Sequence, residues 1–450
     1  MTKTLIKDVK VVNEGEIKAL DVLISGERIE KIEKDITDKK GNVKIIHAEG
    51  LYLIPGMIDD QVHFREPGLT HKGTIYSETR AAVAGGITSF MDMPNTNPNT
   101  TTIDLLETKY ALANASSLAN YSFFMGINKN NLEEALKIDN TTVCGLSDDG
   151  LYFDDNEGIL ANYPEFLEKL FRRTNSLVAL HCEDDFIIKE AYDFYNALFD
   201  GDVPVRCHPL IRTKNACVTA TKRVVDLAEK FNTRLHVLHV STKEETNLFK
   251  GDVGIRDKRI TAEACIHHLW FSDEDYMRLG NKIKWNPAIK TIEDRAGLLK
   301  ALKDNRLDII ATDHAPHLAG EKQGNYDISK SGGPLVQHAL PALLELYHQD
   351  KISLQEIVEK TSHNVAEIYR IKERGYIREG YYADIVLIDL NKSWIASEET
   401  NLYKCGWSPF TDYKFKSKVV GTFVNGAHVF DRGLVKDATF GKRLQFSKER

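Results

Sequence analysis

The hydrophobic pattern near the N-terminus is one of alternation. Apolar and polar residues alternate over residues 4–12, 21–32 and 44–56, and glycines lie between these stretches. Alternation with period two, interrupted by turn residues, is typical of β-strands that are buried on one face. The first 55 residues are therefore predicted to be β-structure.

From residue 56 to residue 374 the pattern is different. Short apolar runs such as ITSFMDM, SLVALHC, RLHVLHV, RITAEA and DIIATDH alternate with longer stretches of helical periodicity such as ACVTATKRVVDLAEKF. Repeated strand–helix alternation predicts a parallel α/β domain, and the length of the region suits a (β/α)₈ barrel.

The strand pattern returns after residue 375, in ADIVLIDL and KVVGTFVNGAHVF. In the second of these, Asn425-Gly426 between two apolar runs predicts a tight β-hairpin. The two ends of the chain thus resemble each other more than they resemble the middle. We predict a small β-sandwich domain formed from residues 1–55 and 375–450, with the barrel of residues 56–374 inserted into it.

Composition narrows the functional classes. The chain has 450 residues, 42% hydrophobic content and a formal net charge of −7, which argues against a nucleic-acid or anionic-membrane surface. No apolar run is long enough to span a membrane, and the N-terminal MTKTLIKDVK lacks the apolar core of a signal peptide. The six cysteines form no CxxC pair, so we expect reduced thiols in a cytoplasmic protein.

Residues that bind metals or carboxylates recur where the predicted strands end. They are His63, Arg65, Asn95, Asp148, Asp149, His181, His239, Asp313 and His317. Alone, a buried histidine is more often a satisfied core residue, and an aspartate after a strand is more often a helix cap. In a (β/α)₈ barrel, however, the carboxyl ends of all the strands meet at one mouth, which is where active sites lie.

These residue types favour metal-assisted hydrolysis. Neutral imidazoles and carboxylates suit Zn²⁺, which lowers the pKa of a bound water to about 7. A carboxylate beside that water is able to take its proton and pass it to a leaving group. Asp313 is our candidate for this catalytic role, and a cap for the loop HAPH is the alternative.

The motifs HFREPG, MPNTNP, SDDG, LHCED, LHVLHVST, TAEACIHHL, WNPAIK and ATDHAPH occur in this order between Gly56 and His317. Each motif is weak by itself, but the ordered set is very specific, and the chain resembles the bacterial long-chain dihydroorotases of the cyclic amidohydrolase superfamily. The resemblance implies a barrel with a flanking β-sandwich. It also implies the reversible cyclisation of N-carbamoyl-L-aspartate to L-dihydroorotate in pyrimidine biosynthesis, commonly with two zinc ions.

The resemblance also implies a role for each site residue. His63 would bind one zinc, Asp149 would bridge the two metals, His181 and His239 would bind the other zinc, and Asp313 would be both ligand and catalytic acid/base. Arg65, Asn95 and His317 would hold the substrate carboxylate, Asn286 would contact the ring, and Gly332 and Gly333 would belong to the substrate loop. The guanidinium of Arg65 is suited to hold the substrate carboxylate because it binds a carboxylate with two parallel hydrogen bonds.

The chain departs from the family pattern at three places. Gln61 occupies the position of the first histidine of the His-x-His motif, Ile266 replaces the usual proline, and SGGPLVQHALPAL differs from the usual glycine-rich loop. The Gln61 carbonyl is at best a weak zinc ligand, whereas three protein ligands and a water suffice for a catalytic zinc. We therefore expect one firmly bound zinc and a second position that is partly occupied or empty.

Two alternatives remain open. The chain could be another cyclic amidase, such as an allantoinase or a dihydropyrimidinase, but those substrates lack the ring carboxylate that Arg65 would bind. Because Gln61 replaces a ligand, the chain could instead be a non-catalytic dihydroorotase-like subunit that scaffolds aspartate transcarbamoylase. Assembly into a homo-oligomer is likewise left open by the sequence.

Overall fold

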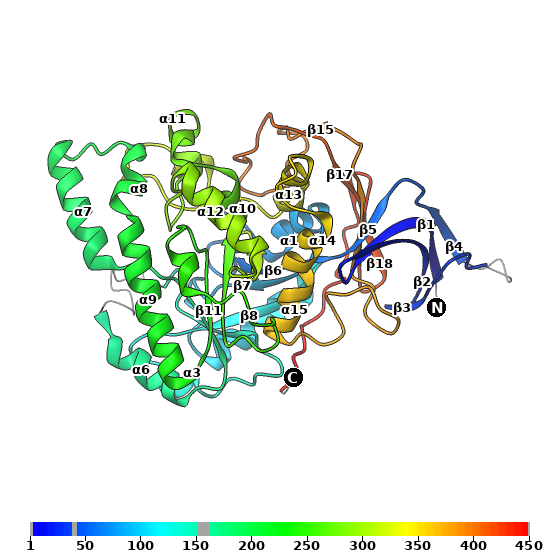
Figure 1. The fold of residues 1–450 in the computed structure, drawn as a ribbon, viewed down its shortest axis with the longest axis horizontal. Helices are drawn as coiled ribbons and strands as arrows, with labels where there is room; N and C mark the ends of the chain where they lie inside the picture. Colours follow the sequence, from blue (N-terminus) through cyan, green and yellow to red (C-terminus); the bar gives the residue numbers. More distant parts are fainter. Residues whose placement is uncertain (1–2, 38–42, 152–161, 449–450) are drawn as a thin grey trace.

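An eight-stranded parallel barrel forms the centre of the chain, in a computed structural model that describes residues 3–37, 43–151 and 162–448 (Figure 1). The strands pair in sequence order from β6 to β13. A bridge between Val62 and His314 and a 2.8 Å hydrogen bond from the His63 amide to the His314 carbonyl join the first strand to the segment after the last. The predicted (β/α)₈ barrel is confirmed. Its strands are β6 Met57–Val62, β7 Ile87–Asp92, β8 Asn120–Gly126, β9 Gly145–Ser147, β10 Leu177–Leu180, β11 Arg234–Val237, β12 Ile260–Cys265 and β13 Ile309–Ala311.

Helices lie around the barrel, and α6, α7 and α9 lie on the side farthest from the terminal sheet (Figure 1). Helix α9 illustrates why they form. Thr213 caps its N-terminus by accepting from the Ala216 amide, its buried residues recur at helical spacing, and Asn232 ends it in a left-handed conformation. The α-helices are α1 Ile75–Ala84, α2 Ile103–Ser116, α3 Leu132–Ala135, α6 Pro164–Arg173, α7 Asp185–Leu198, α8 His208–Ile211, α9 Lys214–Phe231, α10 Ile266–Trp270, α11 Tyr276–Leu279, α12 Ile292–Lys303, α13 Ala339–His348, α14 Leu354–Val358 and α15 Asn364–Tyr369.

A second sheet combines strands from both ends of the chain, as predicted. Strands β5 and β14 pair antiparallel, with Leu53 opposite Leu387, and so join the N-terminal strands to the C-terminal ones. The expected hairpin connects β17 and β18, and both Asn425 and Gly426 have the positive φ that its tight turn requires. The exact domain boundaries stay a prediction. The strands are β1 Lys3–Asn13, β2 Glu16–Ser25, β3 Arg28–Glu33, β4 Val43–His47, β5 Tyr52–Pro55, β14 Ile385–Asp389, β17 Lys418–Val424, β18 Ala427–Asp431 and β19 Leu434–Val435, beside a separate pair, β15 Trp394–Ile395 and β16 Lys414–Phe415.

An apolar cluster packs along the barrel strands. It joins Ile58 and Leu177, near the starts of two strands, to Leu238, just past the end of a third, and to Tyr369 of α15 and Phe446 of the C-terminal segment. The strands that carry the candidate ligands are therefore part of a close-packed interior.

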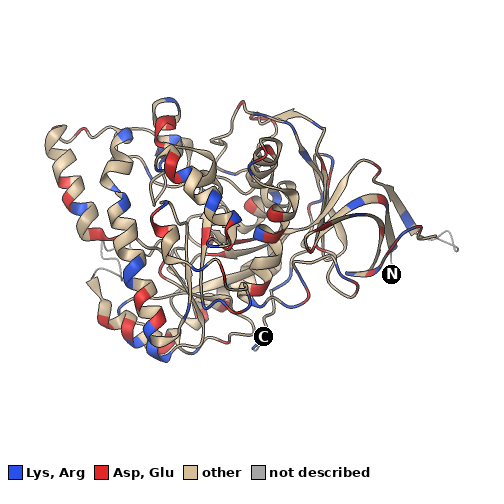
Figure 2. Cartoon of the chain, in the orientation of Figure 1, with Lys and Arg blue, Asp and Glu red and all other residues tan. Residues whose placement is uncertain are grey.

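The charged surface carries both signs. In Figure 2 blue and red residues are interspersed along α6, α7 and α9. Neighbouring turns are paired by exposed salt bridges, such as Lys189–Asp193 at 2.7 Å and Lys222–Asp226 at 2.6 Å. Among the described residues no helix combines the length and the apolar character needed to cross a membrane.

Candidate metal centre and active site

Five predicted ligands converge at the carboxyl ends of the barrel strands. His63 follows β6, Asp149 follows β9, His181 follows β10, His239 follows β11 and Asp313 follows β13, and all five side chains are buried. They form two groups of three donors, in each of which the donor atoms lie within 4.8 Å of one another. Asp149 belongs to both groups, which is the arrangement expected of a carboxylate that bridges two metals.

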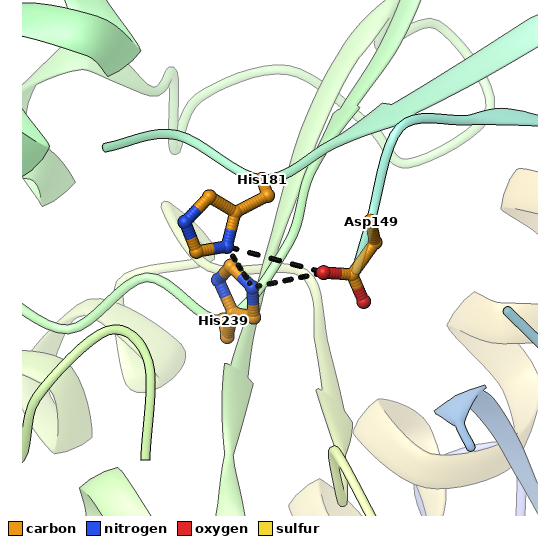
Figure 3. A group of neighbouring side chains, drawn as sticks. All are labelled: Asp149, His181 and His239. Atoms are coloured by element: carbon orange, nitrogen blue, oxygen red, sulfur yellow. Dashed lines mark hydrogen bonds and ion pairs between the residues drawn. The ribbon is translucent and has the colours of Figure 1, made fainter. Parts of the chain in front are cut away.

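The first group consists of Asp149, His181 and His239 (Figure 3). His181 Nδ1 and His239 Nε2 are 3.0 Å apart, and each lies 3.9 Å from Asp149 Oδ1. Two imidazole nitrogens and a carboxylate oxygen that face one another at these distances are a suitable donor set for Zn²⁺.

The second group consists of His63, Asp149 and Asp313. His63 Nε2 lies 3.2 Å from Asp149 Oδ2 and 3.2 Å from Asp313 Oδ1. The other ring nitrogen, His63 Nδ1, lies 2.7 Å from Asn95 Oδ1, a contact that orients the imidazole in the way common for metal ligands. The two oxygens of Asp149 thus face different groups.

Gln61 points into this centre but presents its nitrogen to it. Its Nε2 donates to Asp149 Oδ2 over 3.1 Å, while its Oε1 accepts from the Cys265 thiol over 3.3 Å. The amide oxygen, which we expected to act at best as a weak metal ligand, is therefore directed to Cys265 instead. The reason is that an amide beside both a carboxylate and a thiol satisfies both when its NH₂ faces the acceptor and its oxygen faces the donor.

Burial and ion pairing perturb the ionisation of the second group. Burial by itself would lower the pKa of His63, but hydrogen bonds to Asp149 and Asp313 outweigh it and raise that pKa to about 10. The pKa of Asp149 is lowered well below its usual value, because His239 and His63 overcome the effect of burial. Metal ligands bind in their deprotonated form, so a cation competes with a proton on His63, and its affinity should fall as the pH falls.

Three of the site residues have a strained backbone. Arg65, His239 and Asp313 have φ values of 70°, 36° and 48°, in the left-handed region that side chains with a Cβ rarely adopt. Such conformations cost on the order of 1–3 kcal/mol each and cluster at functional sites. The strain observed here supports a functional role for these strand ends.

Three carboxylates orient the candidate histidine ligands. The sequence pointed to Asp148 as a candidate site residue but not to this role, and it gave no role to Glu183 or Glu263. Asp148 accepts from the His181 amide over 3.0 Å, and Glu263 accepts from the His239 amide over 3.0 Å. Glu183 lies 3.1 Å from His181 Nε2 and is itself paired with Arg212. The signal available in the sequence was the motif LHCED, which places a carboxylate two residues after a candidate ligand.

A third group of possible ligands lies in the barrel interior. It consists of Asp60, His236 and Glu263. His236 Nε2 lies 3.1 Å from Glu263 Oε2 and 3.4 Å from Asp60 Oδ2, and its Nδ1 lies 2.8 Å from the Thr261 hydroxyl. These are the contacts of a hydrogen-bonded layer, and through Glu263 this layer supports the backbone of His239.

Two polar side chains, Arg65 and His317, lie near the second group. Arg65 Nη2 lies 3.2 Å from His317 Nε2, and Arg65 Nε donates to the Pro316 carbonyl over 3.1 Å. Among the charges that affect the pKa of Arg65, the Asp313 carboxylate has the largest effect, so the guanidinium is close to the second group. Asn286 Oδ1 is buried and has no hydrogen-bond partner among the described residues.

The two glycines of the predicted substrate loop use most of their backbone groups within the protein. The Gly332 amide donates to the Lys284 carbonyl over 2.8 Å, and the Gly332 carbonyl accepts from Lys322 Nζ over 2.7 Å. The Gly333 carbonyl accepts from the Ala315 amide over 3.0 Å. A substrate contact through these glycines stays a prediction, and the Gly333 amide is the group best suited to it.

The family of the chain follows from comparison with known proteins. Residues 52–429 match the amidohydrolase family. The chain belongs to this family. Similar members include a dihydroorotase from Aquifex aeolicus, 33% identical over 96% of this chain and 100% of that protein, and one from Carboxydothermus hydrogenoformans, 32% identical over 95% of this chain and 98% of that protein.

Solved structures agree on the fold. The chain superposes on L-hydantoinase from Arthrobacter aurescens with a TM-score of 0.90 at 22% identity, covering 99% of this chain and 100% of that one. For dihydropyrimidinase from Brevibacillus agri the TM-score is 0.87 at 25% identity, with the same coverage. The family match and the relatives confirm the predictions of an amidohydrolase barrel, of the resemblance to dihydroorotases and of an enzyme that hydrolyses cyclic amides.

Proposed function

We propose that the chain is a zinc-dependent dihydroorotase, which opens L-dihydroorotate to N-carbamoyl-L-aspartate and catalyses the reverse ring closure. One observation carries the proposal: the Arg65–His317 pair, suited to a carboxylate, adjoins the two ligand groups that share Asp149. A cyclic amide with a carboxylate on its ring needs both elements in one site. The dihydroorotase relatives, each about as long as this chain, support the same assignment.

Zinc fits the residues present. Asp149, His181 and His239 would hold one ion, and His63, Asp149 and Asp313 would hold a second more weakly, because Gln61 replaces an imidazole there. When bound, zinc supplies Lewis acidity that polarises the amide carbonyl and acidifies water. The nitrogen and oxygen donors, without a thiolate among the two groups, match hydrolytic zinc sites.

Asp313 would move the proton. Its carboxylate faces His63 within the second group, and burial raises its pKa above that of an ordinary aspartate. During hydrolysis it would take a proton from the attacking water and give it to the ring nitrogen as the C–N bond breaks. Ring closure runs the same transfers in reverse. A base of raised pKa accepts the proton more readily, which suits this role.

The remaining residues would bind and orient the substrate. Arg65 and His317 would hold the carboxylate. The oxygen of the Asn95 amide contacts His63, which leaves its NH₂ group to donate to the same carboxylate. The unpartnered, buried Asn286 oxygen is suited to accept from a ring N–H. Hydantoin and dihydrouracil rings carry no such carboxylate, so this pocket favours dihydroorotate over them.

The test combines turnover with metal content. Purified protein should hydrolyse L-dihydroorotate far faster than dihydrouracil or allantoin, lose activity after chelation and regain it with zinc. If the protein instead prefers dihydrouracil or allantoin, which lack the ring carboxylate, it is another cyclic amidase and not a dihydroorotase. Protein that neither binds zinc nor turns over any of the three substrates would favour the non-catalytic scaffold, and gel filtration with and without aspartate transcarbamoylase would then test assembly.

A further inference from the structure

His317 lies between two cationic side chains. Its Nε2 is 3.2 Å from Arg65 Nη2, and its Nδ1 is 3.1 Å from Lys72 Nζ. Lys72 also forms a 2.9 Å salt bridge with Glu321 Oε1, while Glu321 Oε2 lies 3.7 Å from His317 Nδ1, beyond hydrogen-bond distance. His317, Arg65 and Lys72 are each exposed by less than a tenth, at 8%, 6% and 9%, so these contacts are shielded from water.

The imidazole of His317 is able to accept a hydrogen bond at only one of its two ring nitrogens. A neutral imidazole has one N–H donor and one acceptor nitrogen, whereas ammonium and guanidinium groups only donate. His317 is neutral, because burial and the nearby charges of Arg65 and Lys72 hold its pKa well below the usual value, despite an opposing effect of Glu321. The ring therefore accepts from one of its two cationic neighbours only, and its other nitrogen carries hydrogen.

Lys72 is the neighbour that is better fixed. Its ammonium is held by Glu321 and has His317 Nδ1 as its other partner, whereas the Arg65 guanidinium already donates through Nε to the Pro316 carbonyl. We propose that Lys72 is a positioning residue that keeps His317 in the Nε2–H tautomer. His317 Nε2–H and Arg65 then present donors side by side, and the acceptor that suits both is the substrate carboxylate. The inference rests on the proposed function for the identity of that carboxylate.

The kinetic test compares the loss of the donor with its replacement. Lys72→Met removes the donor, and KM for dihydroorotate should rise by about 10- to 100-fold, the effect of losing a hydrogen bond to a charged group. The fall in kcat should be smaller than this rise. Lys72→Arg, which keeps a charged donor, should restore part of the affinity, and Glu321→Gln, which releases Lys72, should raise KM less. Lys330→Met, at an exposed lysine of the segment after β13 that also carries Glu321, controls for the loss of charge and should leave KM within about twofold.

A spectroscopic test addresses the tautomer directly. In ¹⁵N-histidine-labelled protein, with the His317 signals assigned by their absence in His317→Asn, wild type should show a protonated Nε2 and an unprotonated Nδ1. Lys72→Met should shift the ring toward the Nδ1–H form. A protonated Nδ1 in wild type, or an unchanged KM in folded Lys72→Met, would overturn the inference. If wild type does not turn over dihydroorotate, the proposed function fails, while the ¹⁵N spectrum still decides the role of Lys72.

Discussion

Replacing Gln61 with histidine should strengthen one metal position and leave the other unchanged. The Gln61 amide nitrogen and His63 Nε2 both reach the same atom, Asp149 Oδ2, at 3.1 Å and 3.2 Å. Nε2 of histidine is separated from Cβ by the same number of bonds as Nε2 of glutamine. An imidazole at position 61 therefore places its nitrogen beside the second group, where the amide nitrogen, a donor only, is unable to bind a cation.

The size of the effect follows from the ligand count. His63, Asp149 and Asp313 supply three protein donors, and Gln61→His adds a fourth that matches the tetrahedral preference of zinc. Changes outside the ligand shell typically alter metal affinity by about 10- to 100-fold, so the gain of a ligand should reach at least this range. This corresponds to about 1.4–2.8 kcal/mol of binding free energy.

The assay is zinc per chain, measured by mass spectrometry across a series of chelator concentrations. Wild type should retain one zinc and lose the other early, whereas Gln61→His should retain the second to at least tenfold higher chelator strength. Gln61→Met is the matched control, since it removes the amide without supplying a ligand and should give no gain. An unaltered titration in folded Gln61→His, or two tightly held zincs in wild type, would refute the reasoning about Gln61.

Three further changes test other parts of the site. Asp313→Asn should lower kcat by about 10²–10⁴-fold, because an amide does not shuttle a proton; steady-state rates near those of wild type would exclude Asp313 as the acid/base. Arg65→Lys should raise KM for dihydroorotate more than it lowers kcat, since an ammonium lacks the paired geometry of the guanidinium; initial-rate kinetics would show an unchanged KM if Arg65 does not meet the carboxylate. Lys109→Met should destabilise the fold by about 3–5 kcal/mol in urea unfolding, because Lys109 is fully buried in a 2.5 Å pair with Asp92, which in turn accepts from the Phe64 amide; a loss below 1 kcal/mol would contradict this.

The architecture could be predicted because several barrel strands are short apolar runs with a polar residue at or just after their carboxyl end. SLVALHC, for example, contains β10, and His181 directly follows that strand. The terminal sheet could be predicted because its strands alternate, and because Asn425-Gly426 specifies a tight turn. The return of the C-terminal segment to the barrel, where Arg443 bridges to Tyr121, could not be predicted, since those residues carry no periodic pattern.

The convergence of the candidate ligands was easier to predict than the groups that orient them. His63, Asp149, His181, His239 and Asp313 share a position, the carboxyl end of a strand, and chain topology alone brings such positions together. The supporting groups depend on side-chain direction across strands distant in the sequence. This direction is set by packing, so no spacing in the chain reveals it.

Gln61 and Lys72 show the same limit in opposite ways. At position 61 the sequence shows that an imidazole of the expected motif is missing, but it does not specify which end of the Gln61 amide faces the candidate ligands. The thiol of Cys265, on a different strand, decides this. Lys72 lies in a loop with no pattern that distinguishes it from a solvated lysine. Only its contact with His317 and its salt bridge to Glu321 indicate a role.

The two halves of the site are supported independently. The metal ligands rest on carboxylates of the barrel, where Asp148 and Glu263 hold the backbone of two histidines. The residues proposed to bind the substrate carboxylate are supported by the loop after β13, where Glu321 pairs with Lys72. Gln61 hydrogen-bonds only to the first half, since its side-chain partners are Asp149 and Cys265. A glutamine at position 61 would therefore weaken one metal position without disturbing the groups proposed to bind the substrate, because its side-chain contacts do not reach them.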